Sequence, residues 1–210
     1  MTGFWESKFT NEAIAWGYEP ADSAFLAKAL FSKNEVKHIL IPGMGYGRNA
    51  KLFVDHGFQV TGIEISKTAI DLARTKIGLN TRVYHGSVTD MPYDQQSYDG
   101  IFCYALVHLL SASERKAFIR NCHQQLAPNG HMVFTVISKK SPMYGQGIPL
   151  SKDRFELPNG LSVFFYDSDA VEKEFGPYGL IDFAEIAEPI KFQENAPPLD
   201  CILITCKQMG

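Results

Sequence analysis

The feature that most constrains the fold is an apolar run at residues 38–41 that leads, through one proline, into the alternating glycines Gly43, Gly45 and Gly47. An unbroken apolar run of this length is typical of a strand buried on both faces of a parallel sheet. Glycines between such a strand and a helix allow a tight turn and let a ligand approach bare main chain. The free N–H groups and positive dipole end at the start of the helix favour an anionic group. The sequence therefore predicts a ligand site at the end of the first strand.

From residue 36 onward, short β-branched runs alternate with segments of helical period, which is the pattern of a parallel sheet with crossover helices. We predict strands over residues 38–41, 59–64, 82–85, 99–104 and 131–137, with helices over 48–56, 66–77 and 111–126. Ser66 is expected to cap the second of these helices, and Ser111 with Glu114 forms a capping-box pattern for the third. A turn at residues 128–130 is expected to close that third helix.

The two ends of the chain differ in pattern from this central part. Two helices, over residues 11–16 and 21–31, are expected before the first strand. The last third predicts a loop over 138–150, a hairpin around 158–160, a helix over 168–175 and strands over 180–186 and 201–206. Because the last two strands follow each other without a helix, we expect them to form an antiparallel hairpin at one edge of the sheet.

Length and composition narrow the class of protein. The chain has 210 residues, of which 45% are hydrophobic and 20% charged, and this favours a single water-soluble domain. A formal net charge of −3 disfavours nucleic-acid partners. No apolar run approaches the roughly 20 residues of a membrane helix, so no membrane partner is expected. The four cysteines form no C-x-x-C pair, which favours reduced thiols and a cytoplasmic location.

The second predicted strand ends in an acid that bears on the ligand. Glu64 follows Gly43 by 21 residues. In a parallel sheet this places the carboxylate beside the glycine loop, where it can accept hydrogen bonds from two ribose hydroxyls. Arg48 stands where dinucleotide-binding loops carry a small residue, which disfavours a pyrophosphate at the helix start. A nucleoside with an amino-acid tail fits both observations, and a dinucleotide remains the alternative.

These residues resemble the class I S-adenosylmethionine-dependent methyltransferases. The resemblance covers residues 36–137 and rests on the glycine loop, on Glu64, and on Asp90 in the segment 86–92 after the third strand. It implies an α/β, Rossmann-like, doubly wound seven-stranded sheet of order 3-2-1-4-5-7-6, with strand 7 antiparallel and helices on both faces. It also implies S-adenosyl-L-methionine as methyl donor and S-adenosyl-L-homocysteine as product. Pro42 before the first glycine resembles the thiopurine branch, and short aromatic segments resemble the tellurite-resistance-type branch.

The resemblance assigns roles residue by residue. It places the following residues at the cofactor: Gly43, Gly45, Gly47, Asn49, Glu64, Ile65, Asp90, Met91, Cys103 and Tyr104. Tyr104 and His108 would lie near the methyl group and could orient or deprotonate an acceptor, although for His108 the pattern favours a structural, hydrogen-bonded role at the start of a helix over this one. One departure is Ile41, which stands where family members usually carry an acid. The histidine spacing indicates no metal site.

On this reading, residues 1–210 form one methyltransferase domain. It comprises a helical cap (1–35), a cofactor-binding core (36–137) and a substrate-side insertion with the final strands (138–210). The expected activity is in-line methyl transfer to a small molecule, with residues 138–165 forming much of an apolar acceptor pocket, in a monomer or homodimer. Two alternatives are an NAD(P)-dependent oxidoreductase and a non-catalytic module that binds S-adenosylmethionine.

Overall fold

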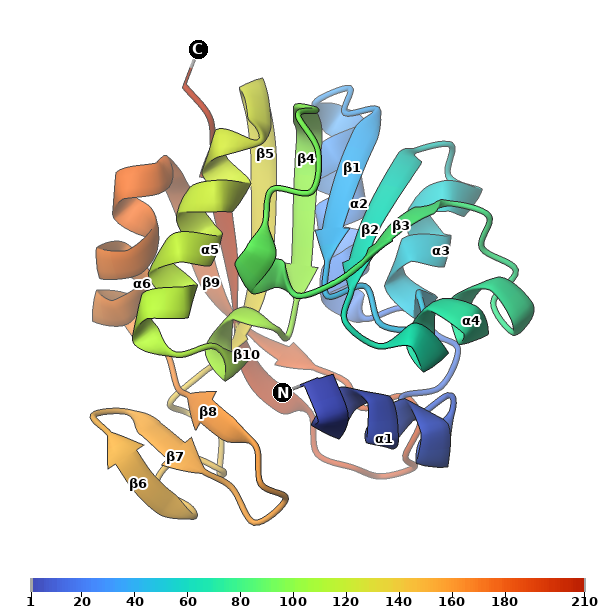
Figure 1. Cartoon of the computed structure of the whole chain (residues 1–210). Coiled ribbons are helices and arrows are strands. Elements are labelled where there is room, and N and C mark those ends of the chain that lie inside the picture. Colours follow the sequence, from blue (N-terminus) through green and yellow to red (C-terminus); the bar gives the residue numbers. More distant parts are fainter. Residues whose placement is uncertain (1, 210) are drawn as a thin grey trace.

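A seven-stranded sheet forms the centre of the protein, described here from a computed structural model that covers residues 2–209 (Figure 1). Its strands are β1 (His38–Pro42), β2 (Gln59–Glu64), β3 (Arg82–His85), β4 (Tyr98–Tyr104), β5 (Leu126–Ile137), β9 (Leu180–Glu188) and β10 (Leu199–Lys207). Their order in the sheet is β3-β2-β1-β4-β5-β10-β9. β1 to β5 pair in parallel, whereas β10 runs antiparallel to both neighbours. Both the predicted strand order and the predicted antiparallel strand are confirmed.

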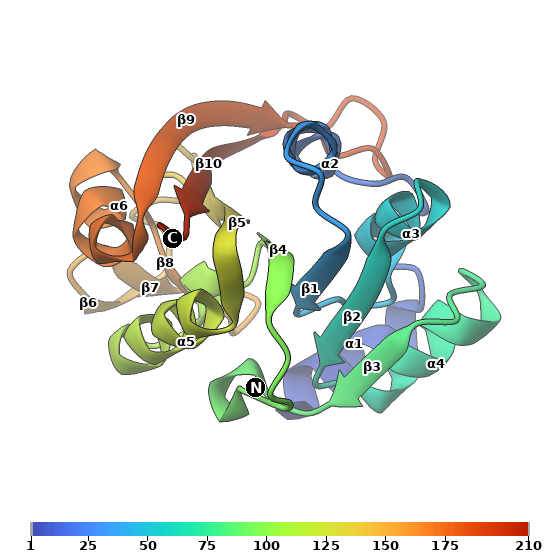
Figure 2. The ribbon, with the colours of Figure 1, turned by 90° about the horizontal axis from the view of Figure 1, so that it is seen from above.

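Helices cover both faces of this sheet (Figure 2). They are α1 (Thr2–Glu12), α2 (Asp22–Lys33), α3 (Arg48–Asp55), α4 (Lys67–Thr75), α5 (Ala112–Gln124) and α6 (Ser168–Phe175), with 3-10 turns η1 (Val88–Asp90), η2 (Val107–Leu109) and η3 (Gly176–Tyr178). Successive residues of β5 pack into opposite halves of the core. Phe134 lies in the cluster that includes α5 and α6, whereas Val133 joins the cluster built with α2 and α3. This alternation gives the sheet two apolar layers, one against each set of helices.

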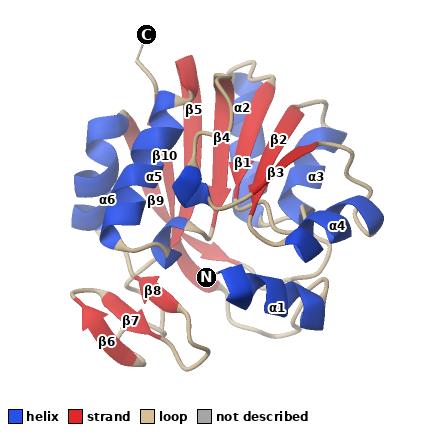
Figure 3. Cartoon of the chain, viewed as in Figure 1, coloured by secondary structure: helices blue, strands red, loops and turns tan. Residues whose placement is uncertain are grey.

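A second, three-stranded sheet lies beyond the carboxyl ends of the parallel strands. It consists of β6 (Ile148–Ser151), β7 (Arg154–Glu156) and β8 (Ser162–Phe164), all antiparallel. Figure 3 shows it as a separate layer near the end of the main sheet that also faces α1. The predicted hairpin around residues 158–160 is the connection between β7 and β8, so this prediction is confirmed.

Local capping signals explain where two helices begin. The Ser66 hydroxyl accepts a hydrogen bond from the N–H of Ala69, and Ser111 with Glu114 forms the predicted reciprocal capping box. The hydroxyls of Ser66 and Ser111 accept hydrogen bonds from backbone N–H groups that would otherwise lack partners in the first helical turn.

Three expected boundaries are wrong. The helix expected at residues 11–16 is α1, which instead ends at Glu12, because Ala13 takes a left-handed conformation (φ 48°) that breaks the helix. β1 continues through Pro42, which pairs with Ile63. β5 begins at Leu126 and includes the expected turn at 128–130, where the register against β4 shifts and Asn129 has a positive φ of 64°. The turn signal therefore marks an irregularity inside the strand.

No helix among residues 2–209 is long and apolar enough to span a membrane. Within the same residues, no group of three His, Cys, Asp or Glu side chains is placed to hold a metal ion. The four cysteines are buried free thiols.

Candidate functional site

A cavity of about 440 Å³ opens at the carboxyl ends of β1, β2 and β4. In Figure 1 these strand ends are directed toward the layer formed by α1 and the small sheet. The glycine loop lines the cavity, together with residues that follow the other central strands. Ligands of open α/β sheets bind at this position, where the connections to the next helices diverge. The site predicted from the glycine loop is therefore a true hollow in the molecule.

The glycine loop is held by the neighbouring strand and needs its glycines. The N–H groups of Gly43 and Met44 both donate to the carbonyl of Ile63, at 2.9 and 3.0 Å. Gly43, Gly45 and Gly47 have φ values of 67°, 60° and 84°, in the left-handed region that favours glycine. A Cβ on Gly47 would lie 2.3 Å from a side-chain carbon of Leu79. The loop thus turns tightly and presents main chain to the cavity.

Glu64 stabilises this loop with a buried carboxylate. Its two oxygens accept hydrogen bonds from the N–H of Gly45 (2.7 Å) and the N–H of Ser66 (2.8 Å). Burial raises the pKa of the Glu64 carboxyl above its usual value, and the backbone donors oppose this rise. Each carboxylate oxygen has a second lone pair, so the group can still accept hydrogen bonds from a ligand hydroxyl.

The structure brings most of the predicted site residues together. Gly43, Gly45, Gly47, Asn49, Glu64, Ile65, Tyr104 and His108 all line the cavity. The Asn49 amide oxygen also accepts from the N–H of Ala21 at 2.9 Å, so this side chain joins α3 to the start of α2. Burial raises the pKa of the Tyr104 phenol well above its usual value, and the Arg48 guanidinium lies 5.4 Å from the centre of its ring.

Asp90, Met91 and Cys103 do not line the cavity. Asp90 is exposed, whereas Met91 and Cys103 are buried in the core. The residues that reach the cavity after β3 are Gly86, Ser87 and Val88, which lie between the end of the strand and the start of η1. The signal that could have identified them is their position directly after the strand end, since the chain turns away within the next three residues.

Aromatic residues of the N-terminal segment close one side of the cavity. Trp5, Phe9 and Trp16 line it, and the Trp16 indole stacks on Tyr46 with ring centres 6.2 Å apart and an interplanar angle of 7°. The Tyr46 hydroxyl donates to the carbonyl of Gly17 (2.7 Å) and accepts from the N–H of Trp16 (3.0 Å). These aromatic rings therefore pack against one another and also cover the cavity.

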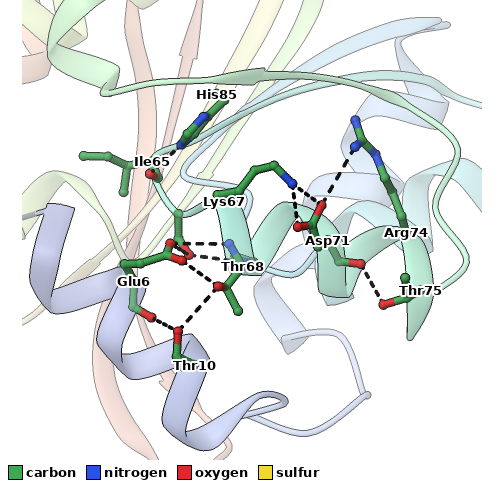
Figure 4. Close-up of polar contacts among 11 residues, drawn as sticks. Glu6, Thr10, Ile65, Lys67, Thr68, Asp71, Arg74, Thr75 and His85 are labelled. Carbon is green, nitrogen blue, oxygen red and sulfur yellow. Dashed lines mark hydrogen bonds and ion pairs between the residues drawn. The ribbon is translucent and has the colours of Figure 1, made fainter.

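Glu6 attaches α1 to the start of α4 (Figure 4). Its carboxylate accepts from the Ser66 hydroxyl at 2.7 Å and from the Thr68 hydroxyl at 2.5 Å. These hydroxyl donors lower the pKa of the Glu6 carboxyl. An acid at this position also interacts favourably with the positive end of α4. Helix α1 is thereby fixed beside Glu64, which lies two residues before Ser66.

The far end of the cavity is mostly apolar. It is lined by Leu109, Ile137, Met143, Leu157, Leu161 and Val163, from η2, the end of β5 and the small sheet with its connections. Among the described residues, the charged side chains that line the cavity are Arg48 and Glu64, both at the glycine-loop end. Asn159, in the connection between β7 and β8, also lines the far end, so the cavity is polar where the glycine loop lies and mostly apolar beyond His108.

Comparison with known proteins agrees with this arrangement. A family model described as a methyltransferase domain matches residues 39–130. The O-methyltransferase resE of Aspergillus sclerotiorum is 29% identical over 138 residues, which are 62% of this chain and 50% of that protein. A ubiquinone biosynthesis O-methyltransferase of Coxiella burnetii is 28% identical over 158 residues, covering 71% of this chain and 67% of that protein. The chain thus spans between half and two thirds of the length of these relatives.

Solved structures show the same fold. The 1,6-didemethyltoxoflavin-N1-methyltransferase of Burkholderia thailandensis, solved with 1,6-didemethyltoxoflavin and S-adenosylhomocysteine bound, has a TM-score of 0.74 at 15% identity and covers 100% of this chain and 87% of its own. The CcbJ methyltransferase of Streptomyces caelestis has the same TM-score and identity, and covers 99% and 98%. The strand order and these matches show that residues 39–130 are similar to a methyltransferase domain and that the chain has the fold of these methyltransferases.

Proposed function

We propose that this protein transfers a methyl group from S-adenosyl-L-methionine to a small-molecule acceptor. The observation that carries the proposal is the two-part cavity, in which a polar end built on the glycine loop and Glu64 continues into an apolar end beside His108. A methyl donor and its acceptor have to meet in one enclosed space, and this cavity provides both halves. The relatives named above as O-methyltransferases and the N1-methyltransferase of known structure support a small acceptor.

The polar end fits the chemistry of the donor. Glu64 would accept hydrogen bonds from the two ribose hydroxyls, while the main chain at Gly43 to Gly47 would lie along the methionine part. Ile65, Ser87 and Val88 would flank the adenine ring. The acid that family members usually carry is replaced by Ile41, so the carbonyl of Gly43 is left as the acceptor for the ammonium group. A cavity lined there by bare backbone and one buried carboxylate suits an uncharged ribose.

Alignment and water exclusion are the main tasks of the protein in this reaction. The sulfonium of the donor supplies a methyl group that is already activated. The chain has to hold the acceptor atom in line with that methyl group, and orientation of this kind can contribute about 7–11 kcal/mol. Trp5, Phe9 and Trp16 cover the cavity from the side of α1 and exclude water. A dedicated general base is not required by this mechanism.

Titration calorimetry tests the donor assignment against the oxidoreductase alternative. We expect saturable binding of S-adenosylhomocysteine and no binding of NADH. The reverse result would falsify the proposal, because a dinucleotide site needs the same strand, loop and acid.

Single-turnover transfer tests activity against mere binding. The Ile41 departure is the observation that favours a non-catalytic module. Protein loaded with methyl-labelled donor should transfer the label to a small molecule of a metabolite extract. Tight donor binding without any transfer would favour the module.

Finer assignments follow as part of the same proposal. The proline before the glycine loop supports placement in the thiopurine-like small-molecule branch, and the aromatic N-terminal segment supports the tellurite-resistance-type branch. The buried free cysteines support work in a reducing compartment such as the cytoplasm. We further infer one domain over residues 1–210, with residues 138–165 supplying acceptor contacts, in a monomer or homodimer.

A further inference from the structure

We infer that His108 acts on the methyl acceptor as a neutral hydrogen-bond donor, and that the acceptor is an uncharged, largely apolar molecule carrying a carbonyl oxygen or ring nitrogen for His108 to bind. His108 is then a positioning residue and not a general base. This inference rests on the proposed function, because it assigns the acceptor end of the same cavity.

The Nδ1 atom of His108 determines the tautomer of the ring. It accepts a hydrogen bond from the backbone N–H of Ile137 at 3.3 Å. A backbone amide can only donate, so Nδ1 carries no proton, and the neutral ring carries its single proton on Nε2. Protonation of Nδ1 would break this bond and set two N–H groups against each other. The geometry thus fixes the tautomer with Nε2 as a donor.

The surroundings of the His108 ring leave its Nε2 side open to the cavity. His108 is buried yet lines the cavity. Within residues 2–209, Nε2 of His108 forms no hydrogen bond. It is also not one of the fully buried side-chain atoms that lack a hydrogen-bond partner there. The Nε2–H group is therefore available to a molecule in the cavity. Burial lowers the pKa of His108 to about 3, so the ring stays neutral at physiological pH.

The acceptor end of the cavity suits an uncharged molecule. Leu109, Ile137 and the apolar side chains of the small sheet surround this end of the cavity. Arg154 bonds the carbonyls of Leu109 and Leu110, and Arg115 bonds the carbonyl of Leu110 at 3.2 Å. Both guanidinium groups are engaged by these main-chain oxygens, and neither lines the cavity. An acceptor carrying its own charge would lose hydration here without gaining an ionic partner.

The same arginines keep His108 in place. Because the carbonyls of Leu109 and Leu110 are bonded by side chains from β7 and α5, the 3-10 turn that carries His108 is fixed from two sides. A donor held in this way loses little freedom when it binds an acceptor atom.

The transfer step balances without a proton on His108. A lone pair of the acceptor atom forms the new bond to the methyl carbon, the sulfur–methyl bond breaks, and its electron pair stays on sulfur. The acceptor enters uncharged, and any proton on its attacking atom leaves to water after transfer. His108 Nδ1 cannot take it, since its lone pair is already engaged by Ile137.

Nitrogen NMR of the histidine-labelled protein tests the tautomer directly. The chain has six histidines, and the spectrum of the H108N variant identifies the His108 signals by their absence. We expect the neutral Nε2–H form across the range from about pH 5 to 8, in which an ordinary histidine titrates. An imidazolium signal or an Nδ1–H tautomer in that range would overturn the inference.

Two isosteric probes test the role in binding. Quinoline and naphthalene have the same shape, but only quinoline offers a ring nitrogen. With the protein saturated with S-adenosylhomocysteine, we expect quinoline to bind roughly five- to tenfold more tightly than naphthalene, which is the effect of one buried neutral hydrogen bond.

Variants then show which atom is responsible. H108N retains an acceptor for the N–H of Ile137 but cannot reach the Nε2 position, so it should bind both probes equally. H108Q places an amide donor at that reach and should recover part of the preference. If S-adenosylhomocysteine binds but wild-type protein does not prefer quinoline, this inference fails while the proposed function stands. If S-adenosylhomocysteine does not bind, the proposed function itself fails.

Discussion

At the scale of single residues, Glu64 is the side chain on which cofactor binding depends most. It is the carboxylate that lines the cavity in the described chain, and it holds the N–H of Gly45 at 2.7 Å. Glu64→Ala should weaken S-adenosylhomocysteine binding at least about tenfold, because hydrogen bonds to a charged group contribute about 1.5–3 kcal/mol. Calorimetry measures the loss. The matched control is Asp90→Ala, an exposed acid outside the cavity, which should leave the affinity unchanged. Equal losses in both variants would contradict this assignment.

The pH dependence of cofactor binding follows from the same residue. Burial raises the pKa of Glu64, so this carboxyl gains a proton at a higher pH than an exposed glutamate, whose usual value is 4.5. The protonated acid is a weaker acceptor for ribose hydroxyls. Affinity for S-adenosylhomocysteine should therefore be constant near neutral pH and fall as the pH drops through the raised pKa. Titrations from neutral pH down to the usual glutamate value of 4.5 measure this fall, and the Glu64→Ala variant should not show it.

Asp90 shows what residue-level reasoning could not supply. The glycine loop and Glu64 could be predicted because a strand end fixes the direction of the very next residues. Asp90 lies four residues after Gly86, and the intervening 3-10 turn directs Ser87 and Val88 into the cavity while leaving Asp90 in solvent. The direction of a short turn depends on its packing, which a single sequence does not display.

At the scale of elements, α1 acts as a cover fixed by one polar group and several aromatic rings. The chain has two tryptophans, Trp5 in α1 and Trp16 in the connection that follows α1, and both pack in the cluster formed with Phe9 and Tyr46. Tryptophan fluorescence therefore reports on the docking of α1 and on little else. The sequence could not fix the bounds of this helix, because its apolar residues pack on the glycine loop and α4 and not on the sheet.

Glu6→Ala should loosen this cover without unfolding the protein. We expect tryptophan quenching by acrylamide to increase roughly twofold while the thermal midpoint changes little, since terminal elements open locally at low cost. Glu12→Ala is the control, because Glu12 lies on the same helix and pairs only with Lys8. No difference between the two variants would refute the role of Glu6.

The docking contact made by Glu6 should be lost at low pH. Since hydroxyl donors lower the pKa of Glu6, its ionised form is favoured by docking. The contribution is fully present above its usual value of 4.5 and disappears as the pH falls through the lowered pKa. Wild-type tryptophan emission should therefore change only below that value, and Glu6→Ala should already show the undocked emission at neutral pH.

Element prediction was reliable where strands are buried on both faces and failed where pairing is local. β2 and β3 match their expected bounds, since an apolar run between turns leaves few alternatives. Residues 148–150 of β6 were expected as loop, and all four residues of this strand are exposed, so no core contact fixes them as a strand. Only its pairing with β7 makes it a strand, and pairing is a property of the fold.

At the scale of the whole molecule, an ion pair with a buried arginine joins the main sheet's helices to the small sheet at the acceptor end of the cavity. Arg115 of α5 bonds Glu174 of α6 at 2.8 Å, and its guanidinium lies 3.8 Å from the ring centre of Phe164 in β8. The Tyr166 hydroxyl donates to the same carboxylate at 2.6 Å. Two helices and the small sheet thus meet at one cation that is only 4% exposed.

Removing one partner of this pair should cost far more than removing the pair. Glu174→Gln leaves the Arg115 charge buried without its carboxylate, so we expect a loss of about 3 kcal/mol and a decrease in Tm of roughly 6–12 °C. The exposed pair of Lys67 and Asp71 is the control, and Asp71→Asn should cost less than about 1 kcal/mol. The double variant Arg115→Met, Glu174→Leu should recover most of the stability, because apolar residues of similar size avoid the desolvation of both charges. This double variant lacks the Arg115 cation that fixes the small sheet, so acceptor binding should stay impaired even though Tm recovers. Recovery of both properties together would show that the pair contributes to stability alone and does not position the acceptor end of the cavity.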